Sequence, residues 1–359
     1  MKANTIRIVR WVLVALMLFA LTLLVSSPSL SEIAPLPLDQ KVPGCPLRED
    51  RWTLIPGEEA LTNERVLSFG TAQPYVLKYD KESRTWAPTE QNAAVSKFDW
   101  HFYEDESISV RCEYATLIPA FKGKKIQSSV TYIRIADPSQ IRTAMSYDTY
   151  KKGGYVEAAD MARHVNAVAA VNGDFFKYHG KVGYVLRQGE FYRDKLNGKR
   201  DLLLIDDQGN FSADYASTSE SAAAKIAALQ EAGRSVVNTF TLGPVLVENG
   251  QARLISETSV AASGEFQWKY AQQRVAVVQV APLQYAIVEA YGKTDGSMGM
   301  TIQEFADYIA FLFPECIMAY NLDGGGSTNV VLKGERIHVT PGHRQISDIL
   351  YFASAWTED

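Results

Sequence analysis

Three consecutive glycines mark the stretch that decides the fold, Ala319-Tyr320-Asn321-Leu322-Asp323-Gly324-Gly325-Gly326-Ser327-Thr328. The apolar run at 316–320 predicts a buried strand that delivers Asn321 and Asp323 to a turn. Glycine adopts positive φ angles and lets backbone N–H groups approach a ligand closely. Together with the carboxylate of Asp323 and the hydroxyls of Ser327 and Thr328, these glycines provide the parts of a site for a polar, anionic ligand.

An alternative is a tight, glycine-rich turn between two strands, because residues 330–332 also predict a strand. The stretch is not a P-loop. That motif needs a lysine directly after its last glycine, and here Ser327 follows Gly326.

Length and composition set the outer limits on the function. The chain has 359 residues, of which 47% are hydrophobic and 21% are charged, so we expect a globular protein of one large or two medium domains. The net charge is −5, and no basic cluster offsets it. We therefore expect no nucleic-acid partner, because such a partner requires a basic face.

The N-terminus carries a targeting signal over residues 1–30. Lys2, Arg7 and Arg10 precede a mostly apolar run at 11–25, which predicts a signal peptide or a signal anchor. The run is long for the apolar core of a signal peptide and short for a helix that spans the membrane. Both remain open, and we favour a retained anchor that contacts the membrane. Either way the rest of the chain is exported: it lies outside the cell membrane, or is secreted if the segment is cleaved.

Three further segments follow the targeting signal. Residues 31–50 predict a linker, residues 51–105 an N-terminal extension, and residues 106–359 the main domain. Of the three cysteines, Cys45 and Cys112 could form a disulfide, although three free thiols are an equal alternative. Cys316 lies in an apolar stretch and predicts a core residue.

The main domain predicts more strands than helices. Strands are expected at 108–114, 130–135, 167–171, 202–205, 240–247, 274–280 and 285–290, with a hairpin at 184–192. Helices are expected at 156–164, at 219–232 with Ser219 as cap and Gly233 as end, and at 302–313 with Thr301 and Glu304 as capping box. The fold class is therefore α+β, a mixed and largely antiparallel sheet core with a few flanking helices, preceded by the membrane segment and the extension.

A second chemical motif, Asn172-Gly173-Asp174-Phe175-Phe176, follows the apolar strand at 167–171. An amide and a carboxylate at the end of a buried strand are placed where open sheets present groups to a ligand. The alternative is an Asn-Gly hairpin turn. The two phenylalanines favour a pocket, because an apolar wall beside polar groups is a common pocket composition.

With both motifs in order, the sequence resembles the phosphodiester glycosidase family, which includes N-acetylglucosamine-1-phosphodiester alpha-N-acetylglucosaminidases and bacterial proteins of the exopolysaccharide-biosynthesis type. The resemblance covers roughly residues 128–353. It includes the segments 170–176 and 321–327, Leu242-Gly243-Pro244-Val245-Leu246-Val247, Asn249-Gly250, Gln273-Arg274-Val275-Ala276 and the helix start at 301–306.

The resemblance implies hydrolysis of a sugar 1-phosphodiester, with a sugar like N-acetylglucosamine, in envelope or extracellular polysaccharide metabolism. The positions that match family motifs are Asn172, Gly173, Asp174, Gly243, Arg274, Asp323, Gly324, Gly325, Gly326 and Ser327. We expect Asp323, Asn172 and Asp174 to be the catalytic residues, and Gly173 and Gly243 to contact the substrate. The sequence departs from the family at Asp174, where many members have glycine, and at 275–278, where the usual strand sequence differs.

These residues suggest a division of roles. We expect Asp323 to stabilise the sugar cation or to activate water, because a phosphate leaving group needs little acid assistance. The segment from Gly324 to Ser327 would bind the phosphodiester or the sugar hydroxyls, and Asn172 would hydrogen-bond the sugar. Arg274 would neutralise the phosphate, with Arg344 as a second candidate.

For each arginine, pairing with a buried carboxylate is an equal alternative. Glu304 predicts a helix cap rather than a catalyst. No ligand spacing supports a divalent cation between Asp174 and Asp323, so we assign no metal, and no cofactor is expected.

The competing function belongs to another class. A non-catalytic envelope module could use the same residues to bind glycans or polymers of the teichoic-acid type. In that case Asp323→Asn would leave glycan binding largely intact, and there would be no turnover to lose.

Overall fold

The computed structural model describes residues 76–89, 101–105, 107–120, 124–150, 154–174, 176, 182–263, 268–292, 298–338 and 343–355. They all belong to the second of two units, Pro35–Asp359. The predicted targeting segment, the linker and most of the extension lie outside the described residues. None of the described helices is long and apolar enough to cross a membrane.

A ten-stranded sheet, here called the large sheet, has the order β14-β13-β17-β15-β16-β5-β4-β1-β2, with β3 also paired to β4. Among the strands described, β1 pairs with β4 in parallel and all other neighbouring strands of this sheet pair antiparallel. The bounds are β1 Val76–Asp80, β2 Thr85–Pro88, β3 His101–Glu104, β4 Ile108–Ile118, β5 Ile126–Ile135, β13 Val245–Glu248, β14 Gln251–Ala252, β15 Arg274–Ala281, β16 Gln284–Ala290 and β17 Met318–Asn321.

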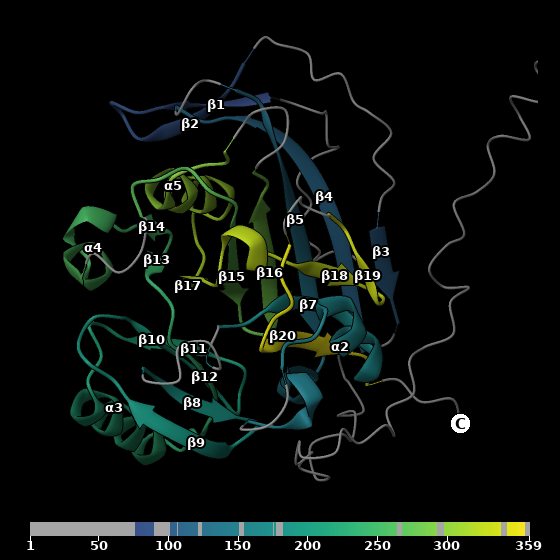
Figure 1. Cartoon of the computed structure of the whole chain (residues 1–359), viewed down its shortest axis with the longest axis vertical. Helices are drawn as coiled ribbons and strands as arrows, with labels where there is room; N and C mark the ends of the chain where they lie inside the picture. Colours follow the sequence, from purple (N-terminus) through teal and green to yellow (C-terminus); the bar gives the residue numbers. More distant parts are fainter. Residues whose placement is uncertain are drawn as a thin grey trace, which may run out of the picture. The chain divides into compact units, whose positions relative to one another are not determined.

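Helix α5 (Ile302–Leu312) packs on the large sheet and contributes Phe305, Tyr308 and Ile309 to its core. In Figure 1 it lies between β2 and β14. The predicted capping box is confirmed, since Thr301 Oγ1 accepts from Glu304 N and the Glu304 carboxylate accepts from Thr301 N. Glu304 also accepts from Ala120 N over 2.7 Å, so this side chain holds the end of β4 as well as the helix.

A five-stranded sheet has the order β19-β18-β7-β20-β6. Its strands are β6 Ile141–Met145, β7 Ala167–Asn172, β18 Val330–Leu332, β19 Glu335–Arg336 and β20 Asp348–Ala353. Helix α2 (Ala158–His164) packs on it through Ala158, Met161 and Ala162. Strand β7 pairs with β18 and β20 and not with the next strand in the sequence. The alternative prediction of a hairpin turn at Asn172-Gly173 is therefore wrong.

The glycine segment connects these two sheets. It leaves β17 in the large sheet and enters β18 in the five-stranded sheet, with a 3₁₀ turn at Gly325–Ser327. The glycine-rich segment thus lies between two strands, as the alternative prediction had it, but β17 and β18 pair with other strands and not with each other.

Two smaller sheets complete the described fold. One has the order β11-β10-β12, with β10 Leu202–Asp206, β11 Phe211–Asp214 and β12 Val236–Phe240; the other pairs β8 Gly183–Arg187 with β9 Glu190–Lys195. Helix α3 (Ser219–Glu231) packs on the first through Ala222 and Leu229. The short helix α4 spans Ser259–Ser263.

The cap of α3 differs from the prediction. Thr218, not Ser219, is the N-cap: its hydroxyl accepts from Ser221 N, while Ser219 donates to Asp194 instead. Gly233 ends the helix with a φ of +74°, as predicted.

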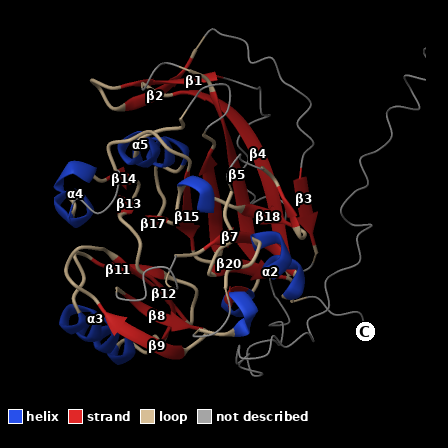
Figure 2. Ribbon diagram, viewed as in Figure 1, coloured by secondary structure: helices blue, strands red, loops and turns tan. Residues whose placement is uncertain are grey.

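The predicted fold class is confirmed for the described residues, where strands outnumber helices and almost all strand pairs are antiparallel (Figure 2). Cys112 and Cys316 are buried free thiols, as expected for Cys316, whereas Cys45 lies outside the described residues.

Candidate active site

The two chemical motifs meet where β7 and β17 end. The side chain of Asn172, the last residue of β7, donates from Nδ2 to the main-chain carbonyl of Asp323 over 2.8 Å. Its Oδ1 accepts from Asn329 N over 2.9 Å, and Asp323 N lies 3.4 Å from Gly173 O. One buried amide thus ties the end of the five-stranded sheet to the glycine segment.

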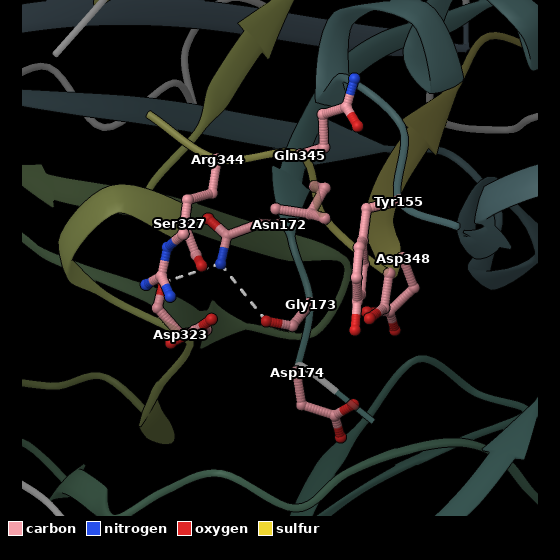
Figure 3. A pocket seen from close by; sticks show the side chains of 11 residues that line it. Tyr155, Asn172, Gly173, Asp174, Asp323, Ser327, Arg344, Gln345 and Asp348 are labelled. Carbon is pink, nitrogen blue, oxygen red and sulfur yellow. Dashed lines mark hydrogen bonds between the residues drawn. The ribbon is translucent and has the colours of Figure 1, made fainter. Parts of the chain in front are cut away.

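A cavity of about 420 Å³ opens at this junction. Figure 3 shows Arg344 above Asp323 at one side, Tyr155 beside Asp348 at the other, and Asn172 and Gly173 between them. The lining residues are Tyr155, Asn172, Gly173, Asp174, Asp323, Ser327, Arg344, Gln345, Ile346, Ser347 and Asp348. The cavity has the size of small-molecule sites in proteins and combines apolar walls with a few polar groups, which is their usual composition.

Asp323 has the chemistry of an acid–base group. Burial raises the pKa of its carboxyl to about 6, and the nearby negative charge of Asp174 acts in the same direction. The hydrogen bond with Ser327 and the positive charge of Arg344 oppose this shift. A carboxyl that titrates near neutral pH can accept a proton from water and release it again within one catalytic cycle.

The glycine segment shapes the wall beside Asp323. A side chain at Gly324 would place its Cβ 2.7 Å from the carbonyl oxygen of Gln273, and Gly325 has a φ of +60°. Both positions therefore favour glycine. Arg344 N donates to Gly326 O over 2.7 Å, which holds the exposed arginine next to the segment.

Two more carboxylates, Asp174 and Asp348, border the cavity from the other side. Both pair with the buried guanidinium of Arg187, at 3.1 Å from Asp174 Oδ1 and 2.8 Å from Asp348 Oδ2. The opposite charges satisfy each other away from water, as buried ionic groups require.

Comparison with known proteins decides the family. Residues 165–353, slightly more than half of the chain, match the phosphodiester glycosidase family. The chain belongs to that family. The match contains both motifs that meet at the cavity, and it confirms the resemblance described above.

Solved structures show the same fold. The catalytic domain of zebrafish N-acetylglucosamine-1-phosphodiester alpha-N-acetylglucosaminidase, auto-inhibited by its pro-peptide, is similar with a TM-score of 0.54 at 16% sequence identity, over 70% of this chain and 84% of that one. A hypothetical protein from Synechocystis is similar with a TM-score of 0.51 at 14% identity, over 77% of this chain and 68% of that one. A sequence comparison with curated proteins gave no match.

Most residues singled out in the family motifs come together. Asn172, Gly173, Asp174, Asp323 and Ser327 line the cavity, and so does Arg344, the second candidate for phosphate contact. The other predicted residues of the glycine segment, Gly324, Gly325, Gly326 and Thr328, build the turn that carries Asp323 and Ser327.

Two predicted residues of the phosphodiester glycosidase motifs lie elsewhere. Arg274 is buried, donates to the carbonyls of Met300 and Tyr270, and is absent from the cavity lining. Burial lowers its pKa to about 10, against the opposing charge of Glu304. Gly243 has a φ of +70° and accepts from Asn321 Nδ2 over 2.9 Å, so it supports the end of β17 instead of the cavity.

Several cavity residues of this family member were not predicted, namely Tyr155, Gln345, Ile346, Ser347 and Asp348, together with Arg187 behind them. Asp348 opens the apolar strand β20, as Asn172 closes β7, and this polar boundary is the signal that could have found it. Within the part of the chain that the structure describes, no three His, Cys, Asp or Glu side chains form a group that could hold a metal ion.

Proposed function

We propose that the protein is an exported hydrolase that cleaves a sugar 1-phosphodiester, with an N-acetylglucosamine-like sugar, in envelope or extracellular polysaccharide metabolism. The observation that carries this proposal is Asp323, a carboxyl with a raised pKa that faces a small-molecule cavity beside the cationic side chain of Arg344. Membership of the phosphodiester glycosidase family supports the same reaction.

The reaction breaks the bond between the anomeric carbon and the bridging oxygen, and the electron pair leaves with the phosphate monoester. Positive charge develops on the sugar ring, as in other glycoside hydrolyses. The oxygen of a water molecule forms the new bond to the anomeric carbon, and its proton passes to the ionised carboxylate of Asp323. Release of that proton to solvent restores the site.

Arg344 fits the phosphate in this scheme. Its guanidinium is exposed at the cavity, close enough to Asp323 for its charge to lower the pKa of that carboxyl. Forked N–H donors match the oxygens of a phosphate group and neutralise its charge. We therefore assign the phosphate contact to Arg344 in place of Arg274.

Export rests on the sequence of residues 1–30, with their basic flank and apolar run. A soluble or membrane-held extracellular enzyme would meet polysaccharides that carry sugar phosphates. Protease accessibility of the main domain on intact cells tests this part of the proposal.

The activity test uses the full chain with an N-acetylglucosamine 1-phosphodiester and, separately, an aryl N-acetylglucosaminide. We expect sugar release from the phosphodiester, loss of that release in Asp323→Asn, and retention in Asp160→Asn, which changes an exposed aspartate on α2. No turnover of several sugar 1-phosphodiesters, with glycan binding retained in Asp323→Asn, would establish a non-catalytic binding module instead.

A further inference from the structure

A buried ion cluster lies at the wall of the cavity, formed by Arg187 of β8, Asp174 after β7 and Asp348 at the start of β20. Arg187 Nη2 lies 3.1 Å from Asp174 Oδ1 and 2.8 Å from Asp348 Oδ2, and Arg187 Nε donates to the same Asp348 oxygen over 3.1 Å. The exposed fractions of the side chains are 2%, 5% and 0%, in the order Arg187, Asp174 and Asp348.

The guanidinium is also held by groups other than the two carboxylates. Its Nη1 donates to the carbonyls of Leu186 and Thr239, and its Cζ lies 4.5 Å from the ring centre of Phe240. Asp174 is held from its other oxygen by Thr241 N, over 2.9 Å. Removing one member of such a buried cluster leaves charge without compensation, so the members depend on one another.

Contacts lead from this cluster to Asp323. A side chain at Gly173 would place its Cβ 2.5 Å from Asp348 Oδ2, so the backbone of Gly173 lies directly against the clamped carboxylate. Gly173 N donates to Asp348 O over 2.9 Å, and Gly173 O lies 3.4 Å from Asp323 N. Gly173 therefore contacts both the Asp348 carboxylate and the main chain of Asp323, so a shift of the cluster would move the Asp323 backbone.

The cluster also acts on the ionisation of Asp323 through the charge of Asp174. The charged groups that act on Asp323 are Asp174, which raises its pKa, and Arg344 and Arg200, which lower it; Ser327 adds a hydrogen bond that lowers it. Asp174 is the acidic member of this set, and Arg187 is the arginine that holds it.

We propose that Arg187 is a positioning residue: its guanidinium fixes Asp174 and Asp348 in the cavity wall and thereby sets both the place of Asp323 and the negative charge that faces it. The effect on turnover rests on the proposed function. The effect on Asp323 itself does not, because its titration can be measured without substrate.

The experiment follows the titration of Asp323 in the full chain by NMR of carbon-13-labelled aspartate carboxyls, assigned by the signal that Asp323→Asn removes. Arg187→Gln, Arg187→Lys and Asp174→Asn are compared with the wild type. The matched control is Arg234→Gln, which removes the arginine partner of another buried aspartate, Asp206, away from the cavity lining.

We expect the titration midpoint of Asp323 to fall in Asp174→Asn, because a negative charge disappears. It should rise in Arg187→Gln, because two carboxylates lose their counter-charge, and it should stay near the wild-type value in Arg187→Lys and Arg234→Gln. The kcat/KM for the phosphodiester should fall on the order of a hundredfold in Arg187→Gln, as expected for a displaced catalytic group, and less in Arg187→Lys.

Unchanged midpoints in both Asp174→Asn and Arg187→Gln, with folding verified by thermal unfolding, would overturn the inference. If Arg187→Gln does not fold, Arg187→Lys decides it. Loss of the forked pairing with Asp348 should change the carboxyl chemical shift of Asp323, and an unchanged shift with unchanged kcat/KM would overturn the inference. Absence of turnover in the wild type would refute the proposed function, and the titration would still decide the role of Arg187.

Discussion

Asn172 and Asp323 lie 151 positions apart in the sequence, and the side-chain amide of the first donates to the carbonyl oxygen of the second over 2.8 Å. The other end of the same amide accepts from Asn329 N over 2.9 Å. The side-chain amide of Asn172 therefore binds the main chain of both Asp323 and Asn329. The geometry supports a role in holding Asp323 and leaves the sugar contact suggested by the sequence as a prediction.

The pH dependence of turnover should report the ionisation of Asp323. Burial raises the pKa of this carboxyl to about 6, so below that pH it is mostly protonated and cannot accept a proton from water. We expect kcat/KM to rise with pH through about 6 and then to level off. Asp323→Asn should lower kcat roughly a hundredfold to ten-thousandfold at the plateau. A profile that is flat between pH 4.5 and 7.5 would contradict the assignment.

Gly173→Ala should damage the site through a steric clash. The new Cβ would lie 2.5 Å from Asp348 Oδ2, and that carboxylate cannot withdraw because Arg187 holds it. We expect a loss of about 1–3 kcal/mol in the free energy of unfolding, with reduced turnover. Gly154→Ala is the control, because nothing lies within 4 Å of its Cβ position. Equal urea midpoints for the two variants would show that the site tolerates the methyl group.

Arg344→Ala should weaken binding of the phosphodiester. The loss of a charge-assisted hydrogen bond corresponds to about 1.5–3 kcal/mol, which is a KM increase of at least about tenfold. Because the Arg344 charge lowers the pKa of Asp323, the rise of the pH profile should also move to higher pH. Gln345→Ala, at the next exposed cavity residue, should change KM much less. A KM that is unaffected by Arg344→Ala would remove this residue from the phosphate site.

Glu289→Gln should stabilise the protein at alkaline pH. Glu289 lies in β16 with 1% of its surface exposed, and burial raises its pKa to about 8, against the opposing effects of Ser129 and Arg336. The unfolded chain loses this proton near the ordinary glutamate pKa, so the folded state binds more protons between that pH and 8. The stability due to protonated Glu289 is therefore fully present at low pH and is lost as pH rises through about 8.

The neutral amide of the variant has no proton to lose. Its advantage over the wild type should be on the order of 4 kcal/mol at pH 9 and should vanish near pH 4. Urea unfolding of both proteins at the two pH values measures this difference. A constant difference between them would mean that Glu289 is not the group that titrates.

The sequence predicted the site where an apolar strand is followed directly by polar residues. The runs at 167–171 and 316–320 predicted strands, and both polar motifs that follow them line one cavity. Asp348 and Tyr155 were missed because each is a single polar or aromatic residue without a motif. Asp348 reaches the site only because its neighbour Ile349 pairs with Asn172, a long-range register that no local pattern records.

Arg274 is the opposite case, a residue of a family motif that is absent from the cavity lining. It opens β15, and side chains of successive strand residues point to opposite faces, so its place depends on which face turns towards the cavity. The sequence around it is apolar on both sides and does not distinguish the faces. In the structure its guanidinium turns to the carbonyls of Met300 and Tyr270.

The glycine segment is one covalent link between the large sheet and the five-stranded sheet, and the cavity is assembled from the ends of a strand in each. If the two sheets came apart, Asp323 and Asn172 would separate even while each sheet kept its own hydrogen-bond ladder. Catalytic rate would then vanish before the circular dichroism of the strands changed. Turnover would thus serve as a sensitive reporter of partial opening in this protein, ahead of any spectroscopic sign of melting.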